Sequence, residues 1–114
     1  MRPERLYLTD IVEAAEAIAD FIAGLDEAGF YQDSKSQSAV LQKLIVIGEA
    51  AARLPQEFRA QYPQIEWRDI IAFRNILVHA YFSIKLEIVW EAAIGDVPEL
   101  QRSVVKILQE MSDD

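Results

Sequence analysis

The chain has 114 residues, a formal net charge of −8, one histidine and no cysteine. This length predicts a single domain over residues 1–114, large enough to bury a core of its own. The missing cysteines exclude disulfides and thiolate metal sites, and one histidine argues against a zinc site within one chain. The acidic charge repels phosphates and argues against non-specific binding to DNA. No apolar run approaches the length of a membrane span, so we expect no membrane contact and a cytoplasmic protein.

Apolar residues recur at intervals of three and four along most of the chain, which is the period of one buried helix face. The pattern predicts an all-α, up-and-down bundle of four main helices with short connecting helices. The first apolar row runs from Leu8 to Leu25, and the second runs from Val40 to Leu54, where Pro55 ends this helix or starts the short one that follows. A connector over residues 26–38 separates the two, and one of its serines is expected to cap the second helix.

The second half of the chain continues the helical pattern. Residues 55–66 predict a short helix and a loop, and the next helix begins at Trp67 and loses its regularity around Tyr81. A further helix covers residues 86–93. The segment Asp96-Val97-Pro98-Glu99 then predicts a break, because an aspartate cap, a first-turn proline and a glutamate three residues after the aspartate mark a new helix start.

The first two helices carry more apolar side chains than a single buried row requires. The surplus residues are Tyr7, Phe21, Leu41, Ile45 and Gly48. A two-fold homodimer is the commonest way to cover such a surface, so we expect one. The alternative is that the connectors at 26–35 and 55–66 fold over it.

The single histidine lies in the segment Arg74-Asn75-Ile76-Leu77-Val78-His79-Ala80-Tyr81. On a helix, Asn75 and His79 lie one turn apart, and Arg74 and Tyr81 share a neighbouring stripe. Arginine binds phosphate oxygens through two N–H groups, and histidine transfers a proton near neutral pH, so the set suits chemistry on a phosphodiester.

Cleavage of RNA by its own 2′-hydroxyl needs one group that takes a proton and one that gives a proton. Two copies of His79 on the axis of a homodimer would supply both, and two copies of Arg74 would stabilise the charge on phosphorus. In an acidic chain this site also needs a local basic spot, for which Arg53, Arg68 and Lys85 are candidates. Neither a metal nor a cofactor enters this scheme.

Two blander interpretations stay open. His79 is a structural residue of a plain helical dimerisation module, or the cleft of Arg74 and His79 holds a nucleotide without cutting anything. Trp67, Trp90 and Phe82 have the chemistry to stack on bases, but tryptophan at helical spacing more often belongs to a core.

Several blocks of the sequence resemble HEPN domains, and in particular the ribonuclease toxins of the HepT type. The segment from Arg74 to His79, with Tyr81, is similar to the Arg-x4-His-x-Tyr motif of that type. The resemblance covers essentially the whole chain, and Ala80 departs from it because aspartate is common at this position. The surrounding blocks, which match in the same order, are Ile47-Gly48-Glu49-Ala50-Ala51, Trp67-Arg68-Asp69-Ile70 and Leu86-Glu87-Ile88-Val89-Trp90.

The resemblance implies a metal-independent ribonuclease that acts as the toxin of a bacterial or archaeal toxin–antitoxin pair. Arg74 and His79 would be catalytic, Asn75 would be a supporting polar residue, and Tyr81 would be the site of AMPylation. The implied partners are an RNA substrate and an MntA-type nucleotidyltransferase antitoxin, which would attach the adenylate. The alternative is a non-catalytic helical subunit that binds a nucleotide or docks a nucleotidyltransferase.

Overall fold

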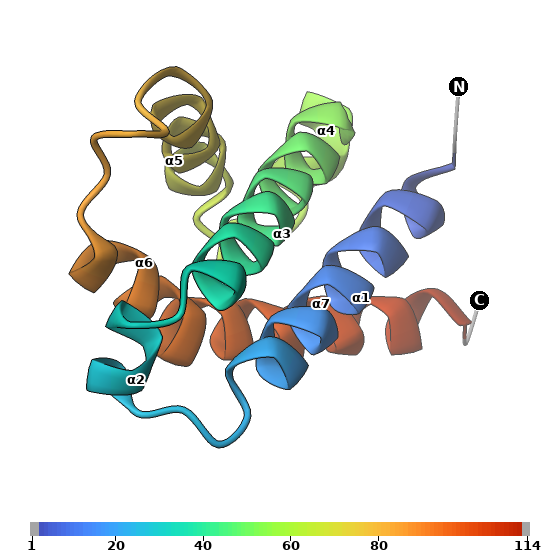
Figure 1. Ribbon diagram of the computed structural model, residues 1–114. Helices are drawn as coiled ribbons and strands as arrows, with labels where there is room; N and C mark the ends of the chain where they lie inside the picture. Colours follow the sequence, from blue (N-terminus) through green and yellow to red (C-terminus); the bar gives the residue numbers. More distant parts are fainter. Residues whose placement is uncertain (1–2, 113–114) are drawn as a thin grey trace.

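The computed structural model describes residues 3–112, and all regular secondary structure in this range is helical (Figure 1). The prediction of an all-α fold is confirmed. The helices are α1 (Glu4–Ile22), α2 (Glu27–Tyr31), α3 (Ser34–Arg53), α4 (Gln56–Ala60), α5 (Trp67–His79), α6 (Leu86–Glu91), the π-helical turn η1 (Ala92–Asp96) and α7 (Val97–Ser112). Within the described range, no helix is both long enough and apolar enough to cross a bilayer.

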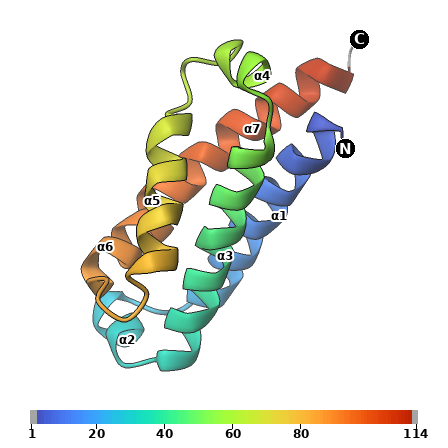
Figure 2. The same ribbon diagram turned by 90° about the horizontal axis from the view of Figure 1, so that it is seen from above.

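Four long helices alternate in direction: α1 and α5 run one way, and α3 and α7 return (Figure 2). Helix α3 packs against both α1 and α5, and α1 also packs against α7, so α3 lies at the centre of the contacts. Their apolar rows meet in one core, because each row lies on the face turned toward the neighbouring helices. The largest fully buried side chains are Leu8, Ile11, Ile18, Phe30, Val40, Leu54, Leu77, Val89, Val104 and Ile107.

The connector after α1 contains the short helix α2, in line with the predicted short connecting helices. Gly24 takes a positive φ of 81° and ends α1, as a glycine just beyond a helix commonly does. The side chain of Asp26 then accepts a hydrogen bond from the backbone N–H of Gly29 at 2.7 Å and starts α2. Asp33 accepts from the N–H of Ser36 at 3.4 Å and starts α3. The predicted cap residue was therefore wrong, because an aspartate one residue before Ser34 satisfies the first free N–H groups.

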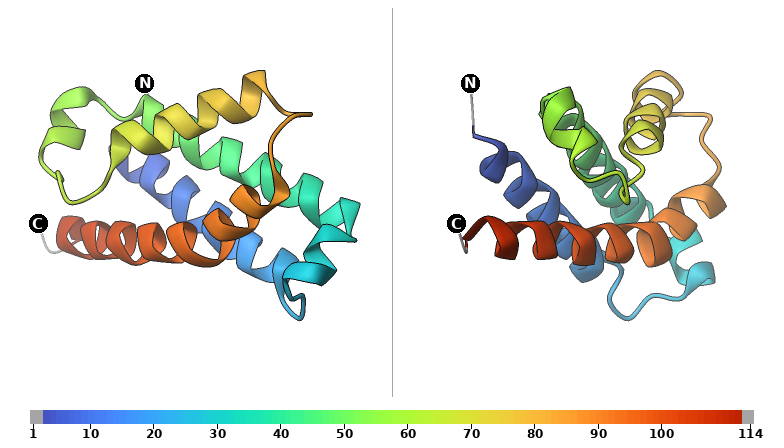
Figure 3. Two further views of the ribbon diagram at one scale, coloured as in Figure 1. Left: turned by 90° about the vertical axis from the view of Figure 1, so that its left-hand side faces the viewer. Right: turned by 180° about the vertical axis from the view of Figure 1, so that it is seen from behind.

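The predicted break at Asp96 is also wrong. Helix α6 continues through η1 into α7, as Figure 3 shows. The N–H of Val97 donates to the carbonyl of Ala92, five residues earlier, which makes a wider π turn. Pro98 has no N–H, and its ring would clash with the carbonyl four residues earlier in a regular helix. The wider turn gives this proline room, so the helix continues instead of restarting.

Most of the surplus apolar surface is covered within one chain. Tyr7, Leu41 and Gly48 are buried. Ile45 is half-buried and Phe21 is exposed. Helix α2 in the first connector packs against α3. Apolar side chains that do remain exposed include Ile76 and Val78 on α5, and Tyr81 and Phe82 just beyond it.

Candidate active site

The arginine–histidine motif occupies the second half of α5. Arg74 turns toward α3, and its side chain is 22 % exposed, whereas Asn75 and His79 are exposed to solvent. This division follows from the helix, since each residue advances about 100° and Asn75 and His79 are four residues apart. One face therefore carries an amide and an imidazole, while the guanidinium of Arg74 lies against α3.

Helix α5 ends at His79, and Ala80 departs from helical geometry with φ −126° and ψ 34°. Tyr81 consequently lies in the turn after the helix, where it is 37 % exposed. The expected helical stripe shared by Arg74 and Tyr81 is therefore wrong. A phenol on a turn is still accessible beside the last residue of the motif.

Gly48 brings Arg74 close to the axis of α3. A Cβ atom on residue 48 would lie 2.1 Å from Cβ and 2.6 Å from Cγ of Arg74. Real side chains do not approach so closely, so only glycine permits this spacing of α3 and α5. The aliphatic part of the Arg74 side chain thus occupies the space that a side chain at residue 48 would fill.

The neighbouring residue on α3 holds the guanidinium. Nη1 of Arg74 donates to Oε1 of Glu49 at 3.0 Å, forming an ion pair across the two helices. Nε of Arg74 is buried and has no hydrogen-bond partner. Arginine carries five N–H donors in a fixed fork, so one contact to Glu49 leaves others for an anionic ligand. Glu49 therefore orients the guanidinium of Arg74 without using up its donors.

The family model described as "Ribonuclease HepT-like" matches residues 11–107 of the chain. A protein of Caldanaerobacter subterraneus subsp. tengcongensis named as a putative RNase is 34 % identical over 109 residues, 96 % of this chain and 97 % of that protein. The "Probable ribonuclease HepT" of Thermococcus cleftensis is 36 % identical over 106 residues, 93 % of this chain and 96 % of that protein. The chain belongs to the HepT-like ribonuclease family. Several relatives in this family are named as putative RNases.

One relative is much longer than this chain. A protein of Methanocaldococcus jannaschii named "Gamma-glutamylcyclotransferase and putative RNase" is 35 % identical over 107 residues. The match covers 94 % of this chain but only 48 % of that protein, so the chain spans about half its length. No solved structure matches the chain.

In this HepT-like ribonuclease, the predicted basic residues do not all lie near His79. Helices α3 and α5 run antiparallel (Figure 2). Arg53 at the end of α3 and Arg68 at the start of α5 therefore lie toward the opposite end of α5 from His79. Lys85 follows the turn beyond α5 and begins α6. Sequence reasoning missed Glu49 as the partner of Arg74, because only the pairing of α3 with α5 brings the two side chains together.

Of the three aromatic residues considered for stacking on bases, two lie in the core and one lies on the surface. Trp67 is buried, and its Nε1–H donates to the carbonyl of Tyr62 at 3.1 Å. Trp90 is buried with its ring centroid 5.3 Å from that of Phe30. Both tryptophans are structural, as the core interpretation predicted. Phe82 is 99 % exposed, and its ring lies edge-on to the ring of Tyr81 with the two ring centroids 5.4 Å apart.

No cluster of three or more His, Cys, Asp or Glu side chains in the described part of the chain is arranged to hold a metal ion. The motif itself offers the guanidinium of Arg74, the imidazole of His79, the amide of Asn75 and the phenol of Tyr81.

We expect Gly48→Ala to lower the free energy of unfolding by about 1–3 kcal/mol, because the added methyl overpacks the contact with Arg74. Gly95→Ala is the matched control, since a Cβ atom there meets nothing within 4 Å. Alanine in a helix normally gains up to about 1 kcal/mol over glycine. Urea unfolding followed by circular dichroism measures both changes. Equal stability of the two variants would mean that the close approach at Gly48 is dispensable.

Proposed function

We propose that this chain is the ribonuclease toxin of a toxin–antitoxin pair and that Arg74 and His79 are its catalytic residues. The observation that carries the proposal is the anchoring of Arg74 by Gly48 and Glu49 on the same helix that carries the exposed His79, in a chain of a ribonuclease family. A guanidinium held between two helices is already oriented before a phosphate arrives, which lowers the cost of binding it. Asn75, one turn before His79, would support the bound RNA through its amide.

The proposed reaction is transesterification within RNA. The 2′-hydroxyl oxygen attacks the adjacent phosphorus, the bond from phosphorus to the 5′-oxygen breaks, and a 2′,3′-cyclic phosphate forms. One imidazole takes the proton from the 2′-hydroxyl, and another gives a proton to the departing 5′-oxygen. Arg74 stabilises the charge on the phosphoryl oxygens through its remaining N–H groups. Every one of these steps uses side chains alone.

The need for two imidazoles supports a homodimer with the two motifs near a shared axis. Each chain carries one histidine, and the exposed apolar residues Ile76 and Val78 lie on α5 beside the motif. Burying these side chains against a second copy would bring two copies of His79 together. Light scattering at micromolar concentration that reports only monomer would contradict this shared site.

Control by an MntA-type nucleotidyltransferase antitoxin completes the proposal. The hydroxyl of Tyr81 would attack the α-phosphorus of ATP, releasing pyrophosphate and leaving adenylate on the tyrosine. Tyr81 is exposed on the turn directly after His79, where an enzyme has access to it. The added phosphate would bring negative charge and bulk to the motif and compete with RNA for Arg74.

The proposal is tested by incubating the purified chain with total RNA and with single-stranded DNA in excess EDTA. We expect fragmentation of the RNA and intact DNA, because only RNA carries the attacking 2′-hydroxyl. Intact RNA under these conditions, with a correctly folded chain, would favour the non-catalytic nucleotide-binding or docking subunit instead.

A further inference from the structure

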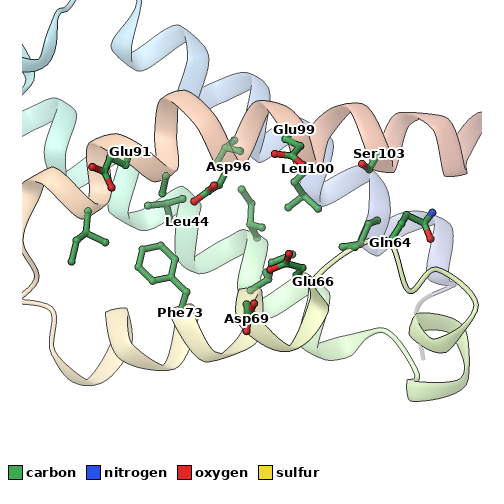
Figure 4. A pocket seen from close by; sticks show the side chains of 16 residues that line it. Leu44, Gln64, Glu66, Asp69, Phe73, Glu91, Asp96, Glu99, Leu100 and Ser103 are labelled. Atoms are coloured by element: carbon green, nitrogen blue, oxygen red, sulfur yellow. The ribbon is translucent and has the colours of Figure 1, made fainter.

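A second surface feature lies apart from the arginine–histidine motif. A groove of about 470 Å³ opens between α5 on one side and the α6–η1–α7 helix on the other. Its floor is apolar: Leu44 and Ile47 come from α3, Phe73 from α5 and Leu100 from α7, as Figure 4 shows in part. Arg74, His79 and Tyr81 do not line it. The groove exists because α5 packs along α3, while α7 packs mainly against α1.

Both edges of the groove are acidic. Glu66 and Asp69 lie on the edge formed by α5, and Glu91, Asp96 and Glu99 lie on the opposite edge (Figure 4). Among the described residues that line the groove, none is Lys, Arg or His. A hydrogen bond with Asp69, together with the negative charge of Asp69, raises the pKa of Glu66 above its usual range. The negative charge is therefore crowded at one edge and has no basic neighbour in the groove.

We propose that this groove is a docking site for a cationic amphipathic segment of a partner protein. Apolar side chains of the segment fill the floor, and its lysines and arginines lie against the two acidic edges. Grooves with an apolar floor commonly bind helices in this way, and complementary charge selects the partner. The apolar floor provides the contact area, and the carboxylates determine which segment fits.

Charge argues against the other occupants. RNA would place phosphates between two rows of carboxylates, which repel them. A second copy of this chain carries a net charge of −8, so its overall field opposes its approach to this acidic surface. The proposal does not depend on the chemistry at His79, so each can fail without the other.

The probe is a fluorescein-labelled, 14-residue peptide of leucine and lysine at helical spacing, and a leucine–glutamate peptide of the same pattern serves as its control. Fluorescence anisotropy with the full chain in physiological salt measures binding. We expect the lysine peptide to bind and the glutamate peptide not to bind. Failure of the native chain to bind the lysine peptide overturns the proposal.

Two double variants test whether peptide binding depends on the groove or on the negative charge of the whole chain. Asp69→Asn with Glu99→Gln removes two charges at the edges, and Glu13→Gln with Glu16→Gln removes two exposed charges on α1, which does not line the groove. We expect the first pair to weaken binding by about fivefold, since exposed ion pairs contribute modestly. The second pair should leave binding within about twofold. An equal loss in both pairs overturns the proposal.

A second pair tests the apolar contact. Ile88 is 42 % exposed and lines the groove, and Ile94 is 51 % exposed on η1 and does not line it. Both sites tolerate a polar residue, because each is already at the surface. Ile88→Asp should weaken binding by about tenfold although it adds an attractive negative charge, whereas Ile94→Asp should not weaken it. Stronger binding by Ile88→Asp would mean that charge alone holds the peptide.

Two further results would identify a different occupant and overturn the proposal. One is a change of oligomeric state in Ile88→Asp, measured by light scattering, which would assign the groove to a second copy. The other is loss of RNA binding in the pair Asp69→Asn and Glu99→Gln. The expected result is that both properties equal those of the native chain.

Discussion

His79→Ala and Arg74→Ala are each expected to lower the rate of RNA cleavage by about 10²- to 10⁴-fold. Removing His79 removes the group that transfers the proton, and removing Arg74 removes the donors that stabilise the phosphoryl charge. The folded state should change little in the histidine variant, because His79 is exposed at the end of α5. Cleavage of a labelled RNA measures the rates, and circular dichroism measures the fold.

Two further arginine variants test whether the position and shape of Arg74 matter, and not only its charge. Arg74→Lys keeps the positive charge but loses the planar fork that faces Glu49, so it should recover only part of the activity. Arg68→Ala is the matched control, because it removes an exposed arginine from the other end of the same helix. Equal losses in Arg68→Ala and Arg74→Ala would mean that arginine acts through net charge alone. Unchanged cleavage by His79→Ala would remove the histidine from the mechanism.

AMPylation of Tyr81 is expected to suppress cleavage to about the level of His79→Ala. The adenylate would add negative charge and bulk just beyond the end of α5, so it would repel the substrate phosphate and obstruct substrate entry. The test is to co-express the chain with a nucleotidyltransferase antitoxin and to weigh the purified product. One adenylate on Tyr81, together with loss of cleavage, is the expected result.

Tyr81→Phe is the control for this modification, because it removes the hydroxyl and keeps the ring that contacts Phe82. The variant should stay unmodified and active in the presence of the antitoxin. Inhibition of Tyr81→Phe that equals inhibition of the native chain would show neutralisation by binding. Adenylate on another residue would move the modification site away from the motif.

Periodicity predicts much of this fold because each long helix buries a single apolar row. The rows through Ile11 and Ile18 in α1 and through Val40 and Leu44 in α3 are buried as the spacing of three and four residues requires. The two boundary errors have local causes. Asp33 offers a cap before the first serine of α3, and the π turn gives Pro98 room without ending the helix. Both effects depend on hydrogen-bond geometry, which the spacing of apolar residues does not reveal.

The candidate site, like the fold, could be predicted only in part from the sequence. The positions of Arg74, Asn75 and His79 on one helix follow from their spacing, because a helix fixes the angles between neighbours. The partner of Arg74 does not follow, since Glu49 is 25 residues away and meets it only through the pairing of α3 with α5. Gly48 sets that pairing, and a glycine in an apolar helix was the one sign of a close approach. The acidic groove combines residues from several elements, so no local pattern predicts it.

The most direct test of the central claim is the chemical form of the ends that the native chain leaves on RNA in EDTA. If His79 drives attack by the 2′-hydroxyl, the upstream fragments carry 2′,3′-cyclic phosphates and the downstream fragments carry 5′-hydroxyls, and His79→Ala produces neither. Fragments with 3′-hydroxyl and 5′-phosphate ends, or the same fragments from His79→Ala at the native rate, would contradict the assignment of Arg74 and His79 as the catalytic pair.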